Sequence, residues 1–296
     1  MPCDNPVHMM DRARRGGYAI GYFESWNLES LQGVVDAAER SRSPVILGFN
    51  GEFLSRPDRM AEERLELYAA MGRAACGSAN VPCGLIFNEC PRDEWIRRAS
   101  KLGFNLVMPA DPEAPYEQYT RRVASLVTYA HEHGVSVEAE LGELPCGASG
   151  VVKHNGSAMT DPALAERFVE ETGVDLLAVS VGNVHIMVNG EQPLDLGRLA
   201  EIRRRVPTPL VLHGGTGIES NSLREAINLG VVKVNFGTYL KQRYLFAIRK
   251  ALTHQNGNPH ELLGIGGECD VMGVGRGAVR DAVLERIGLL GCCGRA

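Results

Sequence analysis

The sequence predicts a closed (β/α)8 barrel, a TIM barrel, that occupies residues 1–296 as one domain. Eight short runs rich in Val, Ile and Leu recur along the chain, separated by longer stretches in which apolar residues have helical spacing. The runs are almost continuously apolar, as expected of parallel strands buried on both faces. Eight strand–helix units in about 250 residues fit a closed barrel better than an open sheet.

The elements follow one another regularly. Apolar residues between the strands recur at helical spacing, as at Leu28 and Leu31, and a Thr-Asp-Pro signal at 160–162 marks another helix start. We expect the Gly-rich segment 264–277 to be a loop and residues 278–290 to form an extra C-terminal helix outside the barrel. The expected strands are 17–23, 44–50, 81–87, 104–109, 135–141, 174–182, 208–215 and 231–237.

Composition excludes several classes of protein. The 296 residues include 31 Lys plus Arg and 36 Asp plus Glu, and the formal net charge of −5 offers no basic surface for nucleic acid. Charges interrupt the N-terminal segment, and no stretch approaches the roughly 18 apolar residues of a membrane span. The eight Cys include no CxxC pair, so neither a zinc knuckle nor a disulfide framework is indicated. We expect a cytoplasmic protein without nucleic-acid or membrane partners.

Polar residues at the ends of the predicted strands are the candidates for chemistry. In a TIM barrel the reactive groups come from the C-terminal ends of the strands and from the loops that follow them. The rule selects Glu24, Asn50, Glu52, Asn88, Glu89, Asp111, Glu138, Glu140, His185, His213 and Asn235.

Two histidines favour a metal site. His185 and His213 follow neighbouring strands and are expected at the same rim, with carboxylates from the third and fifth strands across it. Neutral imidazole and carboxylate oxygen together suit a divalent transition-metal ion.

Two glycine-containing loops favour phosphate. The sequence HGGTG ends at Gly217 and NFGT ends at Thr238, and each opens directly into a helix. Backbone N–H groups at helix starts bind anions, and loops seven and eight of TIM barrels commonly hold phosphate. The alternative is that these glycines form ordinary strand-to-helix turns. With the metal site, the loops indicate a small phosphorylated carbonyl substrate.

Several long segments resemble, in order, the class II, metal-dependent fructose-bisphosphate and tagatose-bisphosphate aldolase family. They include YAIGYFESWNLESLQGVVDAAERSRSPVIL, GVSVEAELGEL, VDLLAVSVGNVH, PLVLHGGTGI, LGVVKVNFGTYLKQ and the terminal GRA. The resemblance implies zinc ligands at His185 and His213, and Lys241 stands where the family has an Arg for a second phosphate. The phosphate contacts that it implies are Gly214, Gly215, Thr216, Asn235 and Thr238.

The chain departs from the family at the end of the third strand. The family has His-Leu-Asp-His there, with the Asp as acid/base and the second His as third zinc ligand, where this chain has Ile86, Phe87, Asn88 and Glu89. An amide at Asn88 orients a hydroxyl but cannot take its proton. Glu89 is able to replace the missing His, because two His and one Glu form a catalytic zinc set. Its other possible role is a solvated carboxylate in a turn.

Other departures lie at the same rim. The family's Asp after strand four is Ala110, the Gly after the strand-six His is Ile186, and the Asp of the strand-eight loop is Gly237. Glu24 and Asn50 stand where the family has Asn and Ser. Asn50 is therefore a candidate substrate contact, and the changes together point to an altered substrate.

The predicted function is a metal-dependent aldolase-type lyase that acts on a phosphorylated ketose or related carbonyl compound. Glu24, Glu138 and Glu140 are the candidates for the missing base, and one of them has the alternative role of orienting a histidine. The alternative function is a non-catalytic sugar-phosphate binder or regulator on the same fold. We also expect a homo-oligomer, a dimer or a tetramer.

Overall fold

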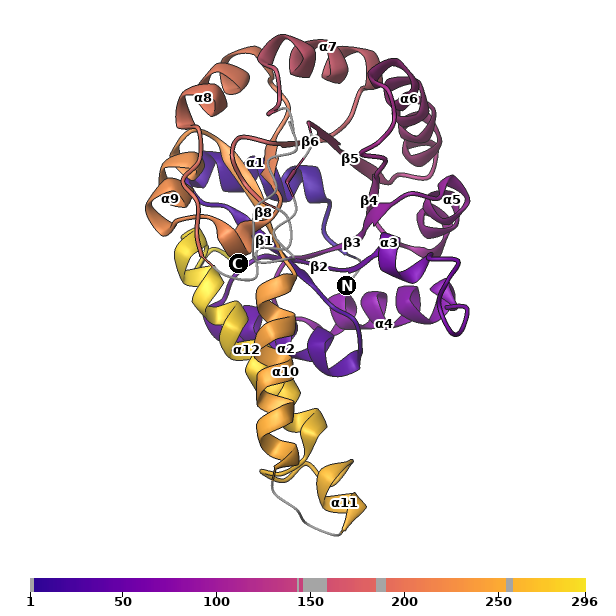
Figure 1. The fold of residues 1–296 in the computed structure, drawn as a ribbon, viewed down its shortest axis with the longest axis vertical. Coiled ribbons are helices and arrows are strands. Elements are labelled where there is room, and N and C mark those ends of the chain that lie inside the picture. The colour runs from indigo at the N-terminus through magenta and orange to yellow at the C-terminus, as the bar shows by residue number, and fades with distance from the viewer. Residues whose placement is uncertain (1–2, 143, 146–158, 185–189, 254–257) are drawn as a thin grey trace.

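The structure is a computed structural model and describes residues 3–142, 144–145, 159–184, 190–253 and 258–296 (Figure 1). Eight parallel strands close into a barrel in chain order, and β1 pairs with β8. Each strand overlaps its predicted run, so the predicted TIM barrel is confirmed. The strands are β1 (Ile20–Glu24), β2 (Val45–Asn50), β3 (Cys83–Cys90), β4 (Leu106–Pro109), β5 (Ser136–Leu141), β6 (Leu176–Val179), β7 (Leu210–Leu212) and β8 (Val231–Phe236).

Helices surround the barrel (Figure 1). None in the described part of the chain is long and apolar enough to cross a membrane. They are α1 (Pro6–Gly16), α2 (Leu28–Ser41), α3 (Gly51–Leu54), α4 (Leu65–Ser78), α5 (Asp93–Leu102), α6 (Tyr116–Glu132), α7 (Pro162–Thr172), α8 (Leu196–Arg205), the 3-10 turn η1 (Gly215–Gly217), α9 (Ser220–Asn228), α10 (Thr238–Leu252), α11 (Pro259–Leu262) and α12 (Val271–Leu290).

Helix α1 lies across the N-terminal end of the barrel. Met9 and Met10 on this helix are fully buried. Just before this helix, Asp4 N donates to Cys83 O at the start of β3. Within it, Arg14 Nη1 donates to Pro207 O ahead of β7. Because α1 covers this end, the functional groups are left to the opposite, C-terminal end of the strands.

The C-terminal helix begins earlier than predicted. Helix α12 starts at Val271, so part of the expected 264–277 loop is helical. Asp270 caps it by accepting from the N–H groups of Met272 and Gly273. A Cβ on Gly275 would overlap the ring of Tyr244, which shows that this glycine serves close packing of α12 on α10.

Helices α10, α11 and α12 project together from one side of the barrel (Figure 1). We call this projection, residues 243–253 and 258–276, the arm.

Candidate active site

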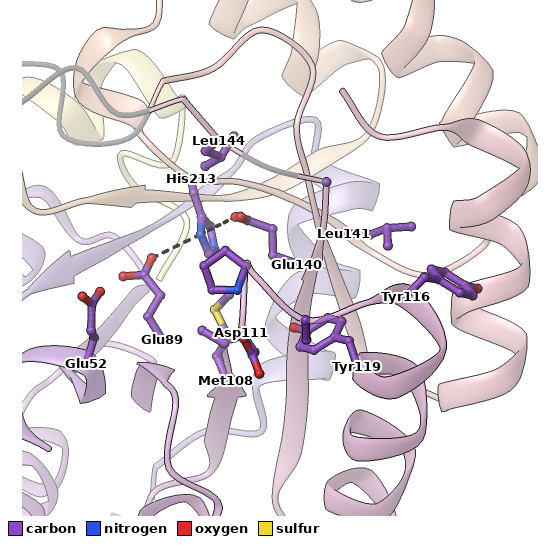
Figure 2. A pocket seen from close by; sticks show the side chains of 14 residues that line it. Glu52, Glu89, Met108, Asp111, Tyr116, Tyr119, Glu140, Leu141, Leu144 and His213 are labelled. Carbon is purple, nitrogen blue, oxygen red and sulfur yellow. Dashed lines mark ion pairs between the residues drawn. The ribbon is translucent and has the colours of Figure 1, made fainter. Parts of the chain in front are cut away.

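His213 lies at the centre of the polar end of the barrel. It directly follows β7, and its side chain is 2% exposed. Its Nε2 lies 2.9 Å from Glu138 Oε1, and its Nδ1 lies 2.8 Å from Glu140 Oε2 and 3.2 Å from Glu89 Oε1. Figure 2 shows Glu89 and Glu140 reaching the imidazole from two sides. Strands β3, β5 and β7 thus bring four predicted site residues together.

Glu89 reaches His213 through an irregular backbone. Its φ of +53° lies in the left-handed region, which a residue such as Glu rarely adopts. It stands where the register of β3 against β4 shifts between Phe87 and Cys90. Asn50 Nδ2 donates to Glu89 Oε2 at 2.7 Å, and Glu89 is only 8% exposed. Glu89 is therefore a buried, oriented carboxylate, and not the solvated turn residue that the sequence left open.

Glu138 is fixed on two sides inside the barrel. Lys233 Nζ on β8 lies 2.8 Å from one of its carboxylate oxygens and donates to the other at 3.1 Å. Burial alone would raise the pKa of Glu138, but the Lys233 ammonium, followed by His213, lowers it. Burial also lowers the pKa of Lys233, against the attraction of Glu138. Since both oxygens are engaged, Glu138 is placed to orient His213 and poorly placed to accept a substrate proton.

Lys233 is a site residue that the sequence reading missed. It is 0% exposed and also donates to Asn235 Oδ1 at 2.6 Å. The signal was present as a single Lys in the apolar run VVKVNF. A charge in the middle of a buried strand requires a partner inside the barrel, and Glu138 is that partner.

The carboxylates around His213 favour positive charge. Burial alone would lower the pKa of this imidazole, but the surrounding carboxylates, with Glu140 the largest contributor, raise it well above its usual value. The same arrangement attracts either a proton or a metal ion to Nδ1.

The donor set fits a divalent metal ion in part. Nδ1 of His213 faces an oxygen of Glu89, the predicted ligand, at 3.2 Å, and ligand atoms bound at about 2.0–2.2 Å to zinc stand roughly 3 Å apart. Within the described residues, no group of three or more His, Cys, Asp or Glu already has the spacing of a metal site. His185, the remaining predicted ligand, and Ile186 lie outside the described residues.

The predicted phosphate loops meet beside this cluster. A cavity of about 320 Å³ is lined by Gly214, Thr216, Asn235 and Thr238, together with Lys241. Thr216 Oγ1 accepts a hydrogen bond from the N–H of Tyr239, which ties the two loops together. The sixth predicted contact is placed differently: a Cβ on Gly215 would overlap Val234 and Phe236, so this glycine packs the loop onto β8 and does not line the cavity.

Two buried amides border the same cavity with unsatisfied atoms. Asn88 is 2% exposed and Asn235 is 7% exposed. Among the described residues, Asn88 Oδ1 and Asn235 Nδ2 find no hydrogen-bond partner. Buried polar atoms are normally paired, so an acceptor and a donor here are available to a ligand.

Two of the family departures are coupled in space. Lys241 Nζ lies 2.5 Å from Glu24 Oε1. A Cβ on Gly237 would overlap Glu24 Oε2. The carboxylate of Glu24 therefore occupies the space into which the side chain of an Asp at position 237 would extend.

A second cavity of about 460 Å³ is lined by His213 and the carboxylates beside it (Figure 2). Glu89 borders both cavities. The predicted rim residues Glu52 and Asp111 line the second one, as do Tyr116 and Tyr119, which the sequence reading missed. Both tyrosines lie at the start of α6, and Tyr119 donates from its hydroxyl to Pro109 O at the end of β4. The sequence could have indicated them as site residues, because they are aromatic and lie shortly after the end of β4.

Comparison with known proteins agrees with this architecture. The family model for fructose-bisphosphate aldolase class II matches residues 4–295. The YdjI aldolase of Escherichia coli K12 is 31% identical with a TM-score of 0.83, covering 100% of both chains. A putative fructose-1,6-bisphosphate aldolase of Coccidioides immitis is 27% identical with a TM-score of 0.81, covering 98% of this chain and 97% of the other.

A third structure, the fructose-bisphosphate aldolase of Campylobacter jejuni, shares the fold at 20% identity and a TM-score of 0.79, covering 100% of this chain and 97% of the other. The matched span and the closed barrel agree, and the chain belongs to the class II fructose-bisphosphate aldolase family, whose members are aldolase-type lyases.

Proposed function

We propose that the protein binds a divalent metal ion and cleaves or forms a carbon–carbon bond in a phosphorylated ketose at this site. The observation that supports the proposal most is the position of Glu89, which borders both cavities. We therefore propose that the phosphate loops and the His213 cluster act on one substrate, which has a phosphate at one end and a carbonyl beyond it.

The ion would be held by Glu89, His213 and His185, a set that suits Zn²⁺. When bound, such an ion supplies Lewis acidity toward the substrate carbonyl. Asn50 orients Glu89, and Glu138 accepts from Nε2 of His213, which leaves Nδ1 as the lone-pair donor. Lys233 keeps Glu138 ionised for that task.

Glu140 is the best placed base. Both oxygens of Glu138 are engaged, by Lys233 and His213, and Glu24 is paired with Lys241 beside the phosphate loops. Glu140 contacts His213 through one oxygen, at Nδ1, the atom that the ion would occupy. Glu140 lines the second cavity, where the part of the substrate beyond the carbonyl extends. In cleavage it would take the proton of the hydroxyl on the carbon that becomes the aldehyde and return it to the carbon of the ketose half at which the bond broke, so that protons balance. Asn88 Oδ1 would accept from a neighbouring hydroxyl.

The arm supports the proposal of a homo-oligomer. Its described residues include side chains that stand largely in solvent, among them Phe246 at 68%, Ile265 at 64% and Leu263 at 56% exposure. Large apolar side chains gathered on one projection are typical of protein–protein interfaces. We propose that the arms of two chains pack together in a dimer or a tetramer.

Metal analysis tests the metal site. We expect purified protein to carry about one divalent ion per chain, and we expect His213→Ala and Glu89→Ala to release it, because each removes one ligand. Glu140→Gln should retain the ion and lose turnover, since it removes a base and not a ligand. Plasma mass spectrometry of the four proteins, side by side, measures this. An ion retained by His213→Ala would remove the metal from the mechanism.

Proton exchange tests the reaction. Dihydroxyacetone phosphate is the smallest phosphorylated ketose, and an aldolase exchanges one of its C3 hydroxymethyl protons with deuterium oxide. We expect exchange with the wild type and none with Glu140→Gln. Phosphate-dependent binding of this ketose without exchange or turnover by the wild type would favour the alternative, a non-catalytic sugar-phosphate binder.

A further inference from the structure

We infer that the substrate carries a single phosphate, and that the half released as the aldehyde is an unphosphorylated, hydroxylated chain. The inference rests on the proposed function and concerns the part of the substrate beyond the reacting carbonyl. It is drawn from the charges that line the two cavities.

The phosphate cavity has cationic capacity for one phosphate. Among its described lining residues Lys241 is the one Lys or Arg, and it stands beside the N–H groups of the two loops. Glu24 already offsets its charge at 2.5 Å, and the absent side chain of Gly237 leaves room for that carboxylate. A single phosphate bound by backbone N–H groups does not need a free lysine.

Lys241 is also held away from the second cavity. Its ammonium lies 4.4 Å from the ring centroid of Phe53 and 5.9 Å from that of Trp26, so aromatic faces hold it on the side of the phosphate loops. Lys241 stands where the family contacts a second phosphate, but its ammonium is already engaged by Glu24 and by two aromatic rings.

The second cavity is acidic. Four carboxylates line it, and its described lining includes no Lys or Arg. With a divalent ion held by Glu89, three further carboxylates remain in this lining, and a phosphate there would bring about −1.5 to −2 charges among them at neutral pH. At short range and in a partly desolvated cavity, such like-charge contacts oppose binding strongly. The four carboxylates belong to Glu52, Glu89, Asp111 and Glu140.

Arg122, which contacts two lining residues of this cavity, is engaged elsewhere. Arg122 Nη1 lies 4.0 Å from Asp111, but its Nε donates to Asp93 at 2.6 Å and its Nη atoms donate to the carbonyls of Ala110 and Pro91. Its guanidinium therefore fixes the loop after β4 and is not turned to a ligand. Carboxylates and the rings of Tyr116 and Tyr119 suit hydroxyl groups and sugar carbons.

A matched pair of aldehydes tests the inference. Exchange of dihydroxyacetone phosphate protons in deuterium oxide first establishes the donor half; failure there would reject the proposed function itself. Given exchange, we expect kcat/KM for condensation with glyceraldehyde to exceed that with glyceraldehyde 3-phosphate by about tenfold or more. A preference for the phosphorylated aldehyde would overturn the inference while leaving the aldolase function intact.

Salt dependence provides a second readout on the unchanged protein. Raising ionic strength screens repulsion between the cavity and a second phosphate. We expect added NaCl to lower the KM for glyceraldehyde 3-phosphate toward that of glyceraldehyde and to leave the latter nearly unchanged. A KM for the phosphorylated aldehyde that rises with salt would show attraction and contradict the inference.

A charge reversal localises the effect. Glu52 on α3 is exposed and lines the second cavity, so Glu52→Lys should raise the preference for glyceraldehyde 3-phosphate over glyceraldehyde by about tenfold. The matched control is Glu132→Lys, the same change at the exposed C-terminal end of α6, far from the cavity mouth. An equal change in both variants would show that net charge, and not the cavity, sets the preference.

Discussion

At the scale of single residues, position 88 decides how far this protein departs from other aldolases. Asn88 is buried beside Glu89, and its Oδ1 has no partner among the described residues. An Asp there would be a proton acceptor, but it would also place a second negative charge next to the carboxylate proposed as a metal ligand. The gain of a proton acceptor outweighs the added negative charge only if no other residue already acts as the base.

We expect Asn88→Asp to leave the rate on the native substrate unchanged or lower it. Glu140 is proposed to transfer the proton, so a new carboxylate adds repulsion without adding a needed base. A general base is typically worth about 10²- to 10⁴-fold in rate, so the contrary case is easily detected. Steady-state kinetics on ketose monophosphate and bisphosphate measures this, with Asn228→Asp on the exposed end of α9 as the charge control. A gain above tenfold in bisphosphate cleavage would return the protein to the ordinary aldolases.

Much of the candidate site was predictable at this scale because strand ends in a barrel converge. That rule selected His213, Glu138, Glu140 and Glu89, and each of the three carboxylates does contact His213. It could not divide the roles of the two strand-five carboxylates. The division depends on Lys233, whose contact with Glu138 crosses the barrel interior and leaves no pattern in the local sequence.

At the scale of elements, strands β5 and β8 are joined by an ion pair inside the barrel. Glu138 and Lys233 are each 0% exposed. Such a pair costs desolvation on both sides, so its main role is specificity of arrangement: it fixes His213 and Asn235 relative to each other.

We expect Lys233→Met to lower the free energy of unfolding by about 3–5 kcal/mol, because it leaves Glu138 buried and unpaired. Urea denaturation measures the loss. Lys101→Met, at an exposed position of α5 on the barrel wall, is the matched control and should change little. The double variant Glu138→Leu/Lys233→Met should recover most of the stability, and a double variant as unstable as the sum of its parts would contradict the ion-pair account.

Strand positions were predictable, whereas some helix limits were not. Continuous apolar runs mark buried parallel strands clearly. Helix α12 begins seven residues before its expected start at Ala278, because Asp270 caps it and Gly275, which resembles a loop residue in the sequence, packs against Tyr244. Glycine lowers helix propensity, but here contact between helices outweighs that cost.

At the scale of the whole molecule, the arm is the part of the chain that the stability of a single barrel does not explain. Its exposed apolar residues do not contribute to the core, and it lies outside the ring of helices (Figure 1). Burial of such residues in a partner chain is the simplest reason for their presence.

We expect Phe246→Glu to shift the protein toward the monomer, since it places a charge at the centre of the proposed interface. Light scattering coupled to size-exclusion chromatography gives the mass directly. Leu67→Glu, a comparable change at a 60% exposed residue of α4 on the barrel wall, should leave the mass unchanged. A monomeric wild type, or a Phe246→Glu variant of unaltered mass, would exclude the arm as the interface.

The contact between Glu24 and position 237 also makes these two positions interdependent under mutation. A Cβ at position 237 would overlap Glu24 Oε2, the far end of a flexible side chain, so any side chain there has to displace the carboxylate from its place beside Lys241. An Asp at position 237 would in addition place a second negative charge next to Glu24. The effect of a side chain at position 237 therefore depends on the residue at position 24, and substitutions at the two positions should not be additive.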